Sequence, residues 1–268
     1  MSSKKSKFLI FSLGLFVFGI ALLGSSESFT HSKVSNNLSN YTVTSGKSFN
    51  SILNEFSLNP IQIALLKIFL KRNSLSIAQA GHYDLTNKSW RDFLLSISNG
   101  DVVIFKLNIP AGKNLYEIKK IISNSRLNND CDDFECLDDR FKFLEGTLKP
   151  DTYFYKDLSS AANILKKSQD EFFKLASTLW SNKNTVLPLK NLSEAIILAS
   201  IVEKEAGNDS EKPIIAGVFL HRISIGMRLQ ADPTIIYGLL PDFNGNITKA
   251  NLKDKNNPYN TYQISGLP

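Results

Sequence analysis

The chain has 268 residues, of which 43% are hydrophobic and 21% are charged. This composition is typical of a folded protein, and the length accommodates one large domain or two modest ones. The formal net charge is +6, but Lys4, Lys5 and Lys7 supply half of that excess, which argues against a nucleic-acid-binding protein. Two cysteines and three histidines are too few for a usual Cys/His zinc site, and we expect neither a metal nor a cofactor.

A single apolar segment follows these lysines. Residues 8–24 carry no charge, and a helix of this length spans about 25 Å, slightly less than the roughly 30 Å hydrocarbon core of a bilayer. We expect residues 1–26 to form a cytoplasmic tip and a transmembrane anchor, with the rest of the chain outside the cytoplasm, because the lysines precede the span. A cleaved signal peptide is the alternative, because Gly24 and Ser26 are small enough for a cleavage site.

A tether and a small α+β module are predicted after the anchor. Residues 27–40 are polar and rich in serine and asparagine, which is typical of a tether. Residues 41–107 carry alternating strand and helix signals and hold no cluster of chemical groups, so we interpret them as a binding or spacer module. The predicted elements are a strand from Tyr41, a helix capped by Ser48, a helix opened by Pro60, a strand at 81–85, a helix from Trp90 that ends at Asn99-Gly100, and a strand at 102–109.

A second α+β region is predicted over residues 108–268. Cys131 and Cys136 lie in an acidic loop, where they either form a disulfide in an oxidising compartment or remain free. The predicted elements around this loop are a helix at 115–122, a turn-rich stretch at 144–155 that ends in a strand, and a long helix at 159–179 with Ile164, Leu165, Phe172 and Leu175 facing inward.

The helix that begins near Ser193 carries the strongest candidate for chemistry. Ser193 is a natural N-cap, and Gly207 suits the helix exit. At 100° per residue, Glu205 falls in the middle of an apolar face, whereas Glu203 falls on the polar side. A carboxyl group on the apolar face loses hydration, which raises its pKa and suits a general acid for breaking a glycosidic bond. The alternative is that Glu205, near the helix end, emerges into solvent or pairs with an arginine.

Four segments of the second region resemble one known family. They are Leu144-Glu-Gly-Thr-Leu-Lys-Pro-Asp-Thr-Tyr, Ile197-Leu-Ala-Ser-Ile-Val-Glu-Lys-Glu, Ala216-Gly-Val-Phe-Leu-His-Arg-Ile-Ser-Ile-Gly-Met-Arg-Leu-Gln-Ala-Asp-Pro-Thr-Ile-Ile-Tyr-Gly and Asn257-Pro-Tyr-Asn-Thr-Tyr-Gln-Ile-Ser-Gly-Leu-Pro. Together they closely resemble the YceG-like, MltG-type endolytic murein transglycosylases. This family is bacterial, is anchored in the inner membrane and cuts peptidoglycan glycan strands in the periplasm.

The resemblance implies a fold class and a division of the chain. We expect an α+β protein in which the anchor at 1–26 and the tether at 27–40 precede a LysM-like module at 41–107, which resembles the family in pattern only. A YceG-like catalytic domain is expected at 108–268. This domain ends earlier than family members normally do, so we expect it to be incomplete at its carboxyl terminus.

The resemblance also implies a reaction and a catalytic residue. The family's catalytic glutamate is the second one of the Glu-Lys-Glu motif, which is Glu205 here. Such a lyase breaks the β-1,4 bond between N-acetylmuramic acid and N-acetylglucosamine without water and leaves a 1,6-anhydromuramoyl end, which ends the elongation of nascent strands. Glycoside hydrolysis differs because it usually needs a pair of carboxylates. The implied partners are glycan strands, the membrane and the penicillin-binding peptidoglycan synthases, with no nucleic acid.

Further polar and aromatic residues of these segments are candidates for substrate binding: Arg222, Gln230, Asp232, Thr234, Tyr237, Tyr259, Asn260, Thr261 and Tyr262. For each of them a structural role in turns, caps, ion pairs or packing is the alternative. We expect Glu145 and Asp151 to organise turns rather than to catalyse. Two other functions remain open, a hydrolase in which Glu205 works with Asp232 and water, and an inactive peptidoglycan-binding scaffold.

Overall fold

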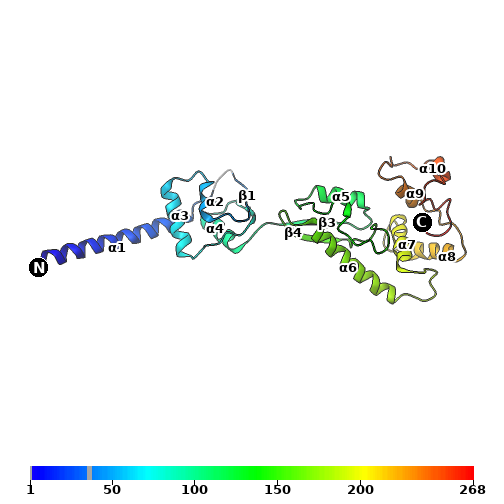
Figure 1. Cartoon of the computed structure of the whole chain (residues 1–268), viewed down its shortest axis with the longest axis horizontal. Helices are drawn as coiled ribbons and strands as arrows, with labels where there is room; N and C mark the ends of the chain where they lie inside the picture. Colours follow the sequence, from blue (N-terminus) through cyan, green and yellow to red (C-terminus); the bar gives the residue numbers. More distant parts are fainter. Residues whose placement is uncertain (1, 35–37) are drawn as a thin grey trace. The chain divides into compact units, whose positions relative to one another are not determined.

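The computed structural model describes residues 2–34 and 38–268. The chain divides into two compact units, Met1–Phe105 with Tyr155–Asp157 and Lys106–Phe154 with Leu158–Pro268. Figure 1 shows the order of the elements along them. Helices and short strands occur together throughout, which confirms the α+β class. The boundaries of the anchor, the tether, the module and the catalytic domain stay predictions.

The first element, α1 (Ser2–Thr30), contains the apolar segment. Among the described residues it is the one helix that is long and apolar enough to cross a membrane, over the 20 residues Phe11–Thr30 with a mean hydropathy of 1.5. Its apolar side chains point outward rather than into a core, and those of Phe11, Phe16 and Phe18 are 61% to 67% exposed. A helix that is apolar on all sides and has no protein around it suits a lipid environment.

The segment after the anchor differs from the tether that the composition of residues 27–40 predicted. The helix continues through Thr30, which is fully buried, and Val34 joins the core of the first unit. The Ser26 hydroxyl, itself buried, donates a hydrogen bond of 2.7 Å to the Leu65 carbonyl. The physical reason is that small hydroxyl side chains allow close helix contact while keeping their polar atoms bonded, so the start of this polar segment packs against the unit. Residues 31–33 and 38–40 are exposed, and residues 35–37 of the predicted tether lie outside the described residues.

The rest of the first unit is built from two paired strands and three helices. The elements are β1 (Asn40–Val43), α2 (Phe49–Asn54), α3 (Pro60–Arg72), β2 (Gly81–Asp84) and α4 (Trp90–Asn99). The strands pair antiparallel, with Tyr41 opposite Tyr83. The LysM-like classification of this module, which came from its resemblance to the family in pattern, stays a prediction.

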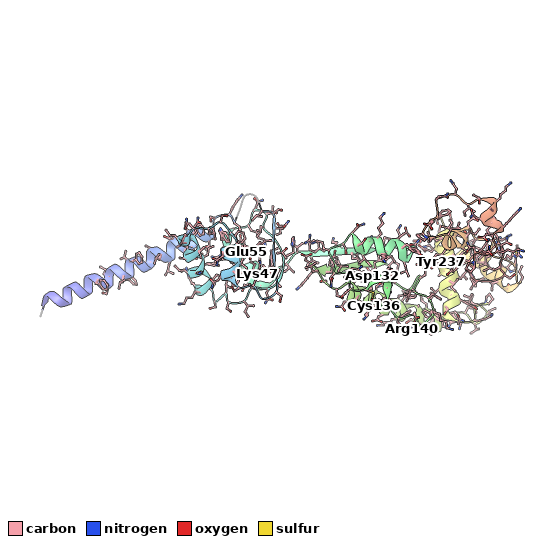
Figure 2. All side chains as sticks on the ribbon, turned by 45° about the horizontal axis from the view of Figure 1, so that its top comes forward. Lys47, Glu55, Asp132, Cys136, Arg140 and Tyr237 are labelled. Carbon is pink, nitrogen blue, oxygen red and sulfur yellow. A yellow bond between two sulfur atoms is a disulfide. The ribbon has the colours of Figure 1, made fainter. Side chains whose placement is uncertain are left out.

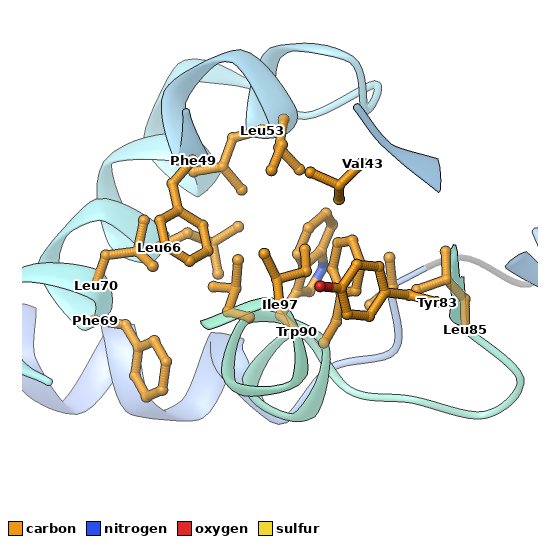
Figure 3. Packing of buried hydrophobic residues seen from close by; sticks show 14 residues of the cluster. Val43, Phe49, Leu53, Leu66, Phe69, Leu70, Tyr83, Leu85, Trp90 and Ile97 are labelled. Carbon is orange, nitrogen blue, oxygen red and sulfur yellow. The ribbon is translucent and has the colours of Figure 1, made fainter. Parts of the chain in front are cut away.

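Local signals explain where these elements begin and end. The Ser48 side chain accepts a hydrogen bond from the Ser51 N–H and caps α2, while Pro60 opens α3 behind the capping residue Asn59. Gly100 ends α4 in the left-handed region with φ of 74°, where a residue without a β-carbon is not strained. Side chains from all of these elements then meet in one core, which Figure 3 shows around Leu53, Leu66, Phe69, Tyr83, Trp90 and Ile97.

The remaining elements follow from residue 104 onward. They are β3 (Ile104–Ile109), α5 (Leu115–Ser123), a short 3-10 helix (Asp132–Phe134), β4 (Asp151–Lys156), α6 (Ala161–Ser181), α7 (Leu192–Glu205), α8 (Lys212–Ser224), α9 (Asp232–Gly238) and α10 (Lys249–Lys253). β3 and β4 form a two-stranded sheet. Cys131 and Cys136 form a disulfide with Cα atoms 5.3 Å apart, which decides between the two alternatives; Figure 2 labels Cys136 in this loop.

Two predictions about helices in this region were wrong in detail. The N-cap of α7 is Asn191 rather than Ser193, because the Asn191 side chain accepts the hydrogen bond from the Glu194 N–H. In α6, Leu175 is 48% exposed, and the buried face instead includes the polar Ser168 and Gln169. These two polar side chains are buried because each hydrogen-bonds to neighbouring loop groups, and for Gln169 these include the Asp138 N–H at 2.8 Å.

Candidate active site

The helix α7 holds its carboxyl-terminal glutamates against a small core. Leu198, Ile201 and Val202 of α7 are buried and pack with Phe219 of α8 and with Leu229. Because this core fixes α7 up to Val202, the last turn projects beyond it and ends at Glu205. Glu205 therefore emerges at the helix end, where it is exposed to solvent.

The two glutamates of this turn have different environments. The Glu203 carboxylate forms an ion pair with Lys212, with the Nζ–Oε2 distance at 2.6 Å, and lies beside Gly112. The carboxyl group of Glu205 has a raised pKa, first because surrounding protein atoms displace water from it and second because the negative charge of Asp232 lies nearby. The Asp232 backbone N–H opposes this by binding the charged form. The net effect of these contributions is a pKa of Glu205 above the ordinary value for a glutamate.

Asp232 is the first residue of α9, and Pro233 in the first turn opens this short helix. The Tyr262 hydroxyl donates a hydrogen bond of 2.8 Å to the Asp232 carboxylate. Burial and this carboxylate raise the pKa of Tyr262 to about 12, so its hydroxyl stays protonated and remains a donor. The result is a cluster of Glu205, Asp232 and Tyr262 from three separate segments.

Gln230 and Arg222 precede Asp232 of this cluster in the sequence. Gln230 has a left-handed backbone with φ of 53° and an exposed side chain, and its N–H donates to the Thr261 carbonyl at 3.2 Å. A non-glycine residue in this region is strained by about 1 to 2 kcal/mol, which is often found at functional sites. The Arg222 guanidinium donates a hydrogen bond to the Leu229 carbonyl, so one of its hydrogen-bond donors is used within the fold.

Three of the predicted substrate-binding residues lie inside the fold. Thr234, Asn260 and Thr261 are no more than 5% exposed. The Thr261 hydroxyl accepts a hydrogen bond from the Ala231 N–H at 2.9 Å and lies 2.9 Å from the Thr234 hydroxyl. The Asn260 amide donates to backbone carbonyls within α10 and directly after it. The contacts of Thr261 join the carboxyl-terminal loop to the start of α9. They position Asp232 rather than a substrate.

An aromatic pair and a partly buried carboxyl group, that of Glu145, lie at the other end of α9. The rings of Tyr237 (Figure 2) and Tyr259 meet edge to face with centroids 4.8 Å apart, and Tyr259 is 39% exposed. The Glu145 carboxylate accepts hydrogen bonds from the Leu115 N–H at 3.1 Å and from Tyr237, and burial raises its pKa. The sequence predicts only a turn-organising role for Glu145. Glu145 belongs to the first of the four segments that resemble the family, and this was the one feature of the sequence that indicated a position near the site.

The described residues, 2–34 and 38–268, contain no group of three or more His, Cys, Asp or Glu side chains arranged to hold a metal ion. What the site does present is acid–base chemistry. One carboxyl group has a raised pKa, a second carboxylate lies beside it, and a tyrosine hydroxyl donates a hydrogen bond to the second. Such a combination can protonate a leaving oxygen and stabilise positive charge on a sugar.

Comparison with known proteins gives a consistent result. The chain is 26% identical to an endolytic murein transglycosylase of Bacillus subtilis over 284 residues, covering 95% of this chain and 76% of that protein. It is 33% identical over 130 residues to a protein of the same name from Streptococcus pneumoniae, covering 46% of this chain and 23% of the relative. A crystal structure of a YceG-like protein from Listeria monocytogenes superposes with a TM-score of 0.52 at 26% identity, covering 85% of this chain and 84% of that one.

The match to a family model extends across both units. Residues 41–268 match the YceG-like family, and these residues include α7 with Glu205 as well as the module that precedes it. Because the match covers far more than half of the sequence, the chain belongs to the YceG-like family.

Proposed function

We propose that this protein is an endolytic murein transglycosylase, a lyase of peptidoglycan, with Glu205 as its acid–base catalyst. The observation that carries the proposal is the raised pKa of a solvent-accessible Glu205 carboxyl group beside Asp232. The names of the relatives from Bacillus subtilis and Streptococcus pneumoniae support the same reaction class.

The proposed reaction needs one carboxyl group in two steps. Protonated Glu205 gives its proton to the glycosidic oxygen as the bond from that oxygen to C1 of N-acetylmuramic acid breaks. The resulting carboxylate then takes the proton of the muramoyl 6-hydroxyl while O6 forms a bond to C1. The products are a free 4-hydroxyl and a 1,6-anhydro end. No water is consumed, and Glu205 is protonated again at the end of the cycle.

Asp232 has a separate part in this proposal. Positive charge develops at C1 in the transition state, and a carboxylate held in place by Tyr262 stabilises that charge at little reorganisation cost. The same charge adds to the effect of burial in raising the pKa of Glu205. We propose Gln230, Arg222 and the ring of Tyr259 as further substrate contacts, since Gln230 and Tyr259 are exposed and Arg222 is partly so.

The proposed location follows from α1. We propose that α1 anchors the protein in the bacterial inner membrane with the catalytic unit in the periplasm, where the disulfide Cys131–Cys136 is stable and the glycan strands lie. Peptidoglycan synthases of the penicillin-binding class are the proposed partners, because they supply nascent strands.

Hydrolysis is the second candidate, and the nearness of Asp232 to Glu205 favours it. A pair of carboxyl groups is what a glycoside hydrolase uses, with one as the acid and the other activating water. Mass spectrometry of products from purified glycan strands separates the two reactions, because hydrolysis adds one water and leaves a reducing muramic acid. Anhydromuramoyl ends support the transglycosylase. Reducing ends formed by a protein whose activity depends on Glu205 would establish the hydrolase.

A further inference from the structure

The helix α3 carries an apolar face that the core of its unit does not cover. Leu66, Phe69 and Leu70 point into that core, as Figure 3 shows. At 100° per residue, Ile61, Ala64 and Ile68 lie on the opposite side of the helix. The Ile61 side chain is 72% exposed, Ala64 is exposed, and Ile68 is only partly buried. These three apolar side chains are neighbours on one face, unlike a single apolar residue scattered on a surface.

The charges of α3 accompany this outer face. Its sequence contains Lys67, Lys71 and Arg72 and has neither aspartate nor glutamate. Lys67 and Lys71 are exposed and lie along one side of the apolar residues. An apolar strip bordered by lysines is the pattern of a helix that lies in the interface of a membrane, with its apolar side chains toward the acyl chains and its lysines at the headgroups.

The junction with α1 fixes the position of α3 relative to the anchor. The Ser26 hydroxyl donates to the Leu65 carbonyl at 2.7 Å. The Glu27 carboxylate forms ion pairs with Arg91 at 2.5 Å and with Arg72 at 3.4 Å. These contacts surround the last turns of α1, so α3 lies directly beside the point where the apolar helix meets the folded unit (Figure 1).

The length of the free part of α1 then determines how deep this junction lies. The uncharged residues 8–25 precede Ser26 and span about 27 Å as a helix. The hydrocarbon core of a bilayer is about 30 Å thick. A helix that crosses the bilayer therefore has no length to spare, and Ser26 must lie at the boundary of the hydrocarbon. α3, bonded to Ser26, then lies within the headgroup layer.

We propose that the outer face of α3 binds the surface of the membrane that α1 spans. This outer face consists of Ile61, Ala64 and Ile68 with Lys67 and Lys71. Its ligands are the upper acyl chains and anionic headgroups. The contact holds the amino-terminal unit against the membrane in one orientation, instead of leaving it free on a polar tether. The inference concerns a surface apart from the proposed active site and does not depend on the reaction.

Depth-dependent quenching of a fluorophore tests this contact in the full chain. Single cysteines are introduced by Ile61→Cys, by Asn40→Cys on β1 as an exposed control, and by Phe18→Cys in the anchor. The native cysteines are joined in a disulfide and do not take the label under non-reducing conditions. The protein is placed in phosphatidylglycerol–phosphatidylcholine vesicles that contain lipids with nitroxides at the headgroup or deep in the acyl chain.

We expect headgroup nitroxides to quench the label at Ile61 several-fold more than the label at Asn40, and acyl-chain nitroxides to quench the label at Phe18. Quenching at Ile61 that equals the Asn40 level, with Phe18 quenched, overturns the proposal while leaving the anchor in place. An unquenched label at Phe18 shows that α1 is not in the bilayer, which overturns the proposal through its premise. Neither outcome bears on the catalytic assay.

A charge-matched pair of variants tests the lysines. Lys67→Gln with Lys71→Gln should reduce quenching at Ile61 in anionic vesicles, because each lysine near such a surface favours binding about fivefold. The same double change on α6, Lys166→Gln with Lys174→Gln, should have no effect. An equal result for both double variants, or a loss in phosphatidylcholine alone as large as that in anionic vesicles, contradicts the proposed preference for anionic lipid.

Discussion

Two neighbouring glutamates allow the proposed catalyst to be separated from its surroundings. Glu205→Gln keeps the size of the side chain and an amide able to hydrogen-bond, but it removes both the proton for the leaving oxygen and the base for the 6-hydroxyl. General acid–base catalysis contributes about 10²- to 10⁴-fold. Because one group serves both steps, we expect a loss at or above the upper end, which is about 5 kcal/mol of activation free energy.

Glu203→Gln is the matched control, two residues away on the same helix. It breaks the ion pair of 2.6 Å with Lys212, in which the side chains are 32% and 33% exposed. Pairs with this much solvent contact contribute at most about 1 kcal/mol to stability. Lys212 also keeps Asp209 as a partner at 2.7 Å. We therefore expect a folded protein with nearly unchanged activity.

The assay is the initial rate at which soluble muropeptides are released from purified glycan strands, with circular dichroism and thermal melting as controls for folding. Both variants should melt close to the unmutated protein. The reasoning is refuted if the Glu205 variant retains activity, or if the Glu203 variant, still folded, loses as much as the Glu205 variant.

Three further predictions concern the support of the site and its stability. In a denaturant titration, Gly238→Ala should lower the free energy of unfolding by about 1 to 3 kcal/mol, because the new β-carbon would lie 2.0 Å from the Asn257 Oδ1 atom. The control is Gly217→Ala inside α8, where the new β-carbon has nothing within 4 Å and should raise the free energy of unfolding by about 0.5 to 1 kcal/mol. Thr261→Val should cost about 1 to 3 kcal/mol and reduce activity, since it leaves the buried Ala231 N–H without its acceptor; an unchanged denaturation midpoint would contradict this. Replacing both Cys131 and Cys136 by serine should cost about 2 kcal/mol, the entropy expected for so short a loop, and activity at 25 °C should persist.

Predictions from sequence succeeded where a local group determines the backbone. Ser48, Pro60 and Gly100 begin or end helices through contacts within a few residues, and each lies in the structure where its chemistry places it. They failed where distant residues determine the outcome. Leu175 fits an apolar face by periodicity, yet α6 buries Gln169 instead, because the loop at Asp138 supplies hydrogen bonds to its side chain.

The candidate site likewise combines a residue that local periodicity selects with neighbours that come from distant segments. The helical wheel selected Glu205 over Glu203, although it placed Glu205 toward a core, whereas the residue emerges at the helix end with its hydration only partly removed. The group that completes its environment, Asp232, is 27 residues further along the chain, and its own partner Tyr262 is 30 residues beyond that. Periodicity has no information about such separations. The contacts of Glu145 to Leu115 and Tyr237 likewise come from distant segments, so the sequence alone did not predict them.

The negative charge of Asp232 should affect the pH dependence of activity, which variants of Glu205 itself cannot test. A general acid works only while protonated, so activity falls as the pH rises through the pKa of Glu205. Burial and the negative charge of Asp232 raise that pKa, which extends activity to higher pH. Asp232→Asn removes the charge but keeps an oxygen that accepts the Tyr262 hydrogen bond, so the pKa of Glu205 falls and the alkaline limb of the kcat/KM profile moves to lower pH.

Tyr262→Phe is the control for this shift, because it removes the hydrogen bond of 2.8 Å and leaves the charge in place. Its activity should fall as Asp232 loses its orientation, while the alkaline limb stays close to that of the unmutated protein. An alkaline limb that stays in place in Asp232→Asn, or moves to higher pH, would mean that the aspartate charge does not act on the Glu205 proton. Equal shifts in the two variants would assign the effect to the geometry of the cluster instead of to charge, because only one of them changes the charge beside Glu205.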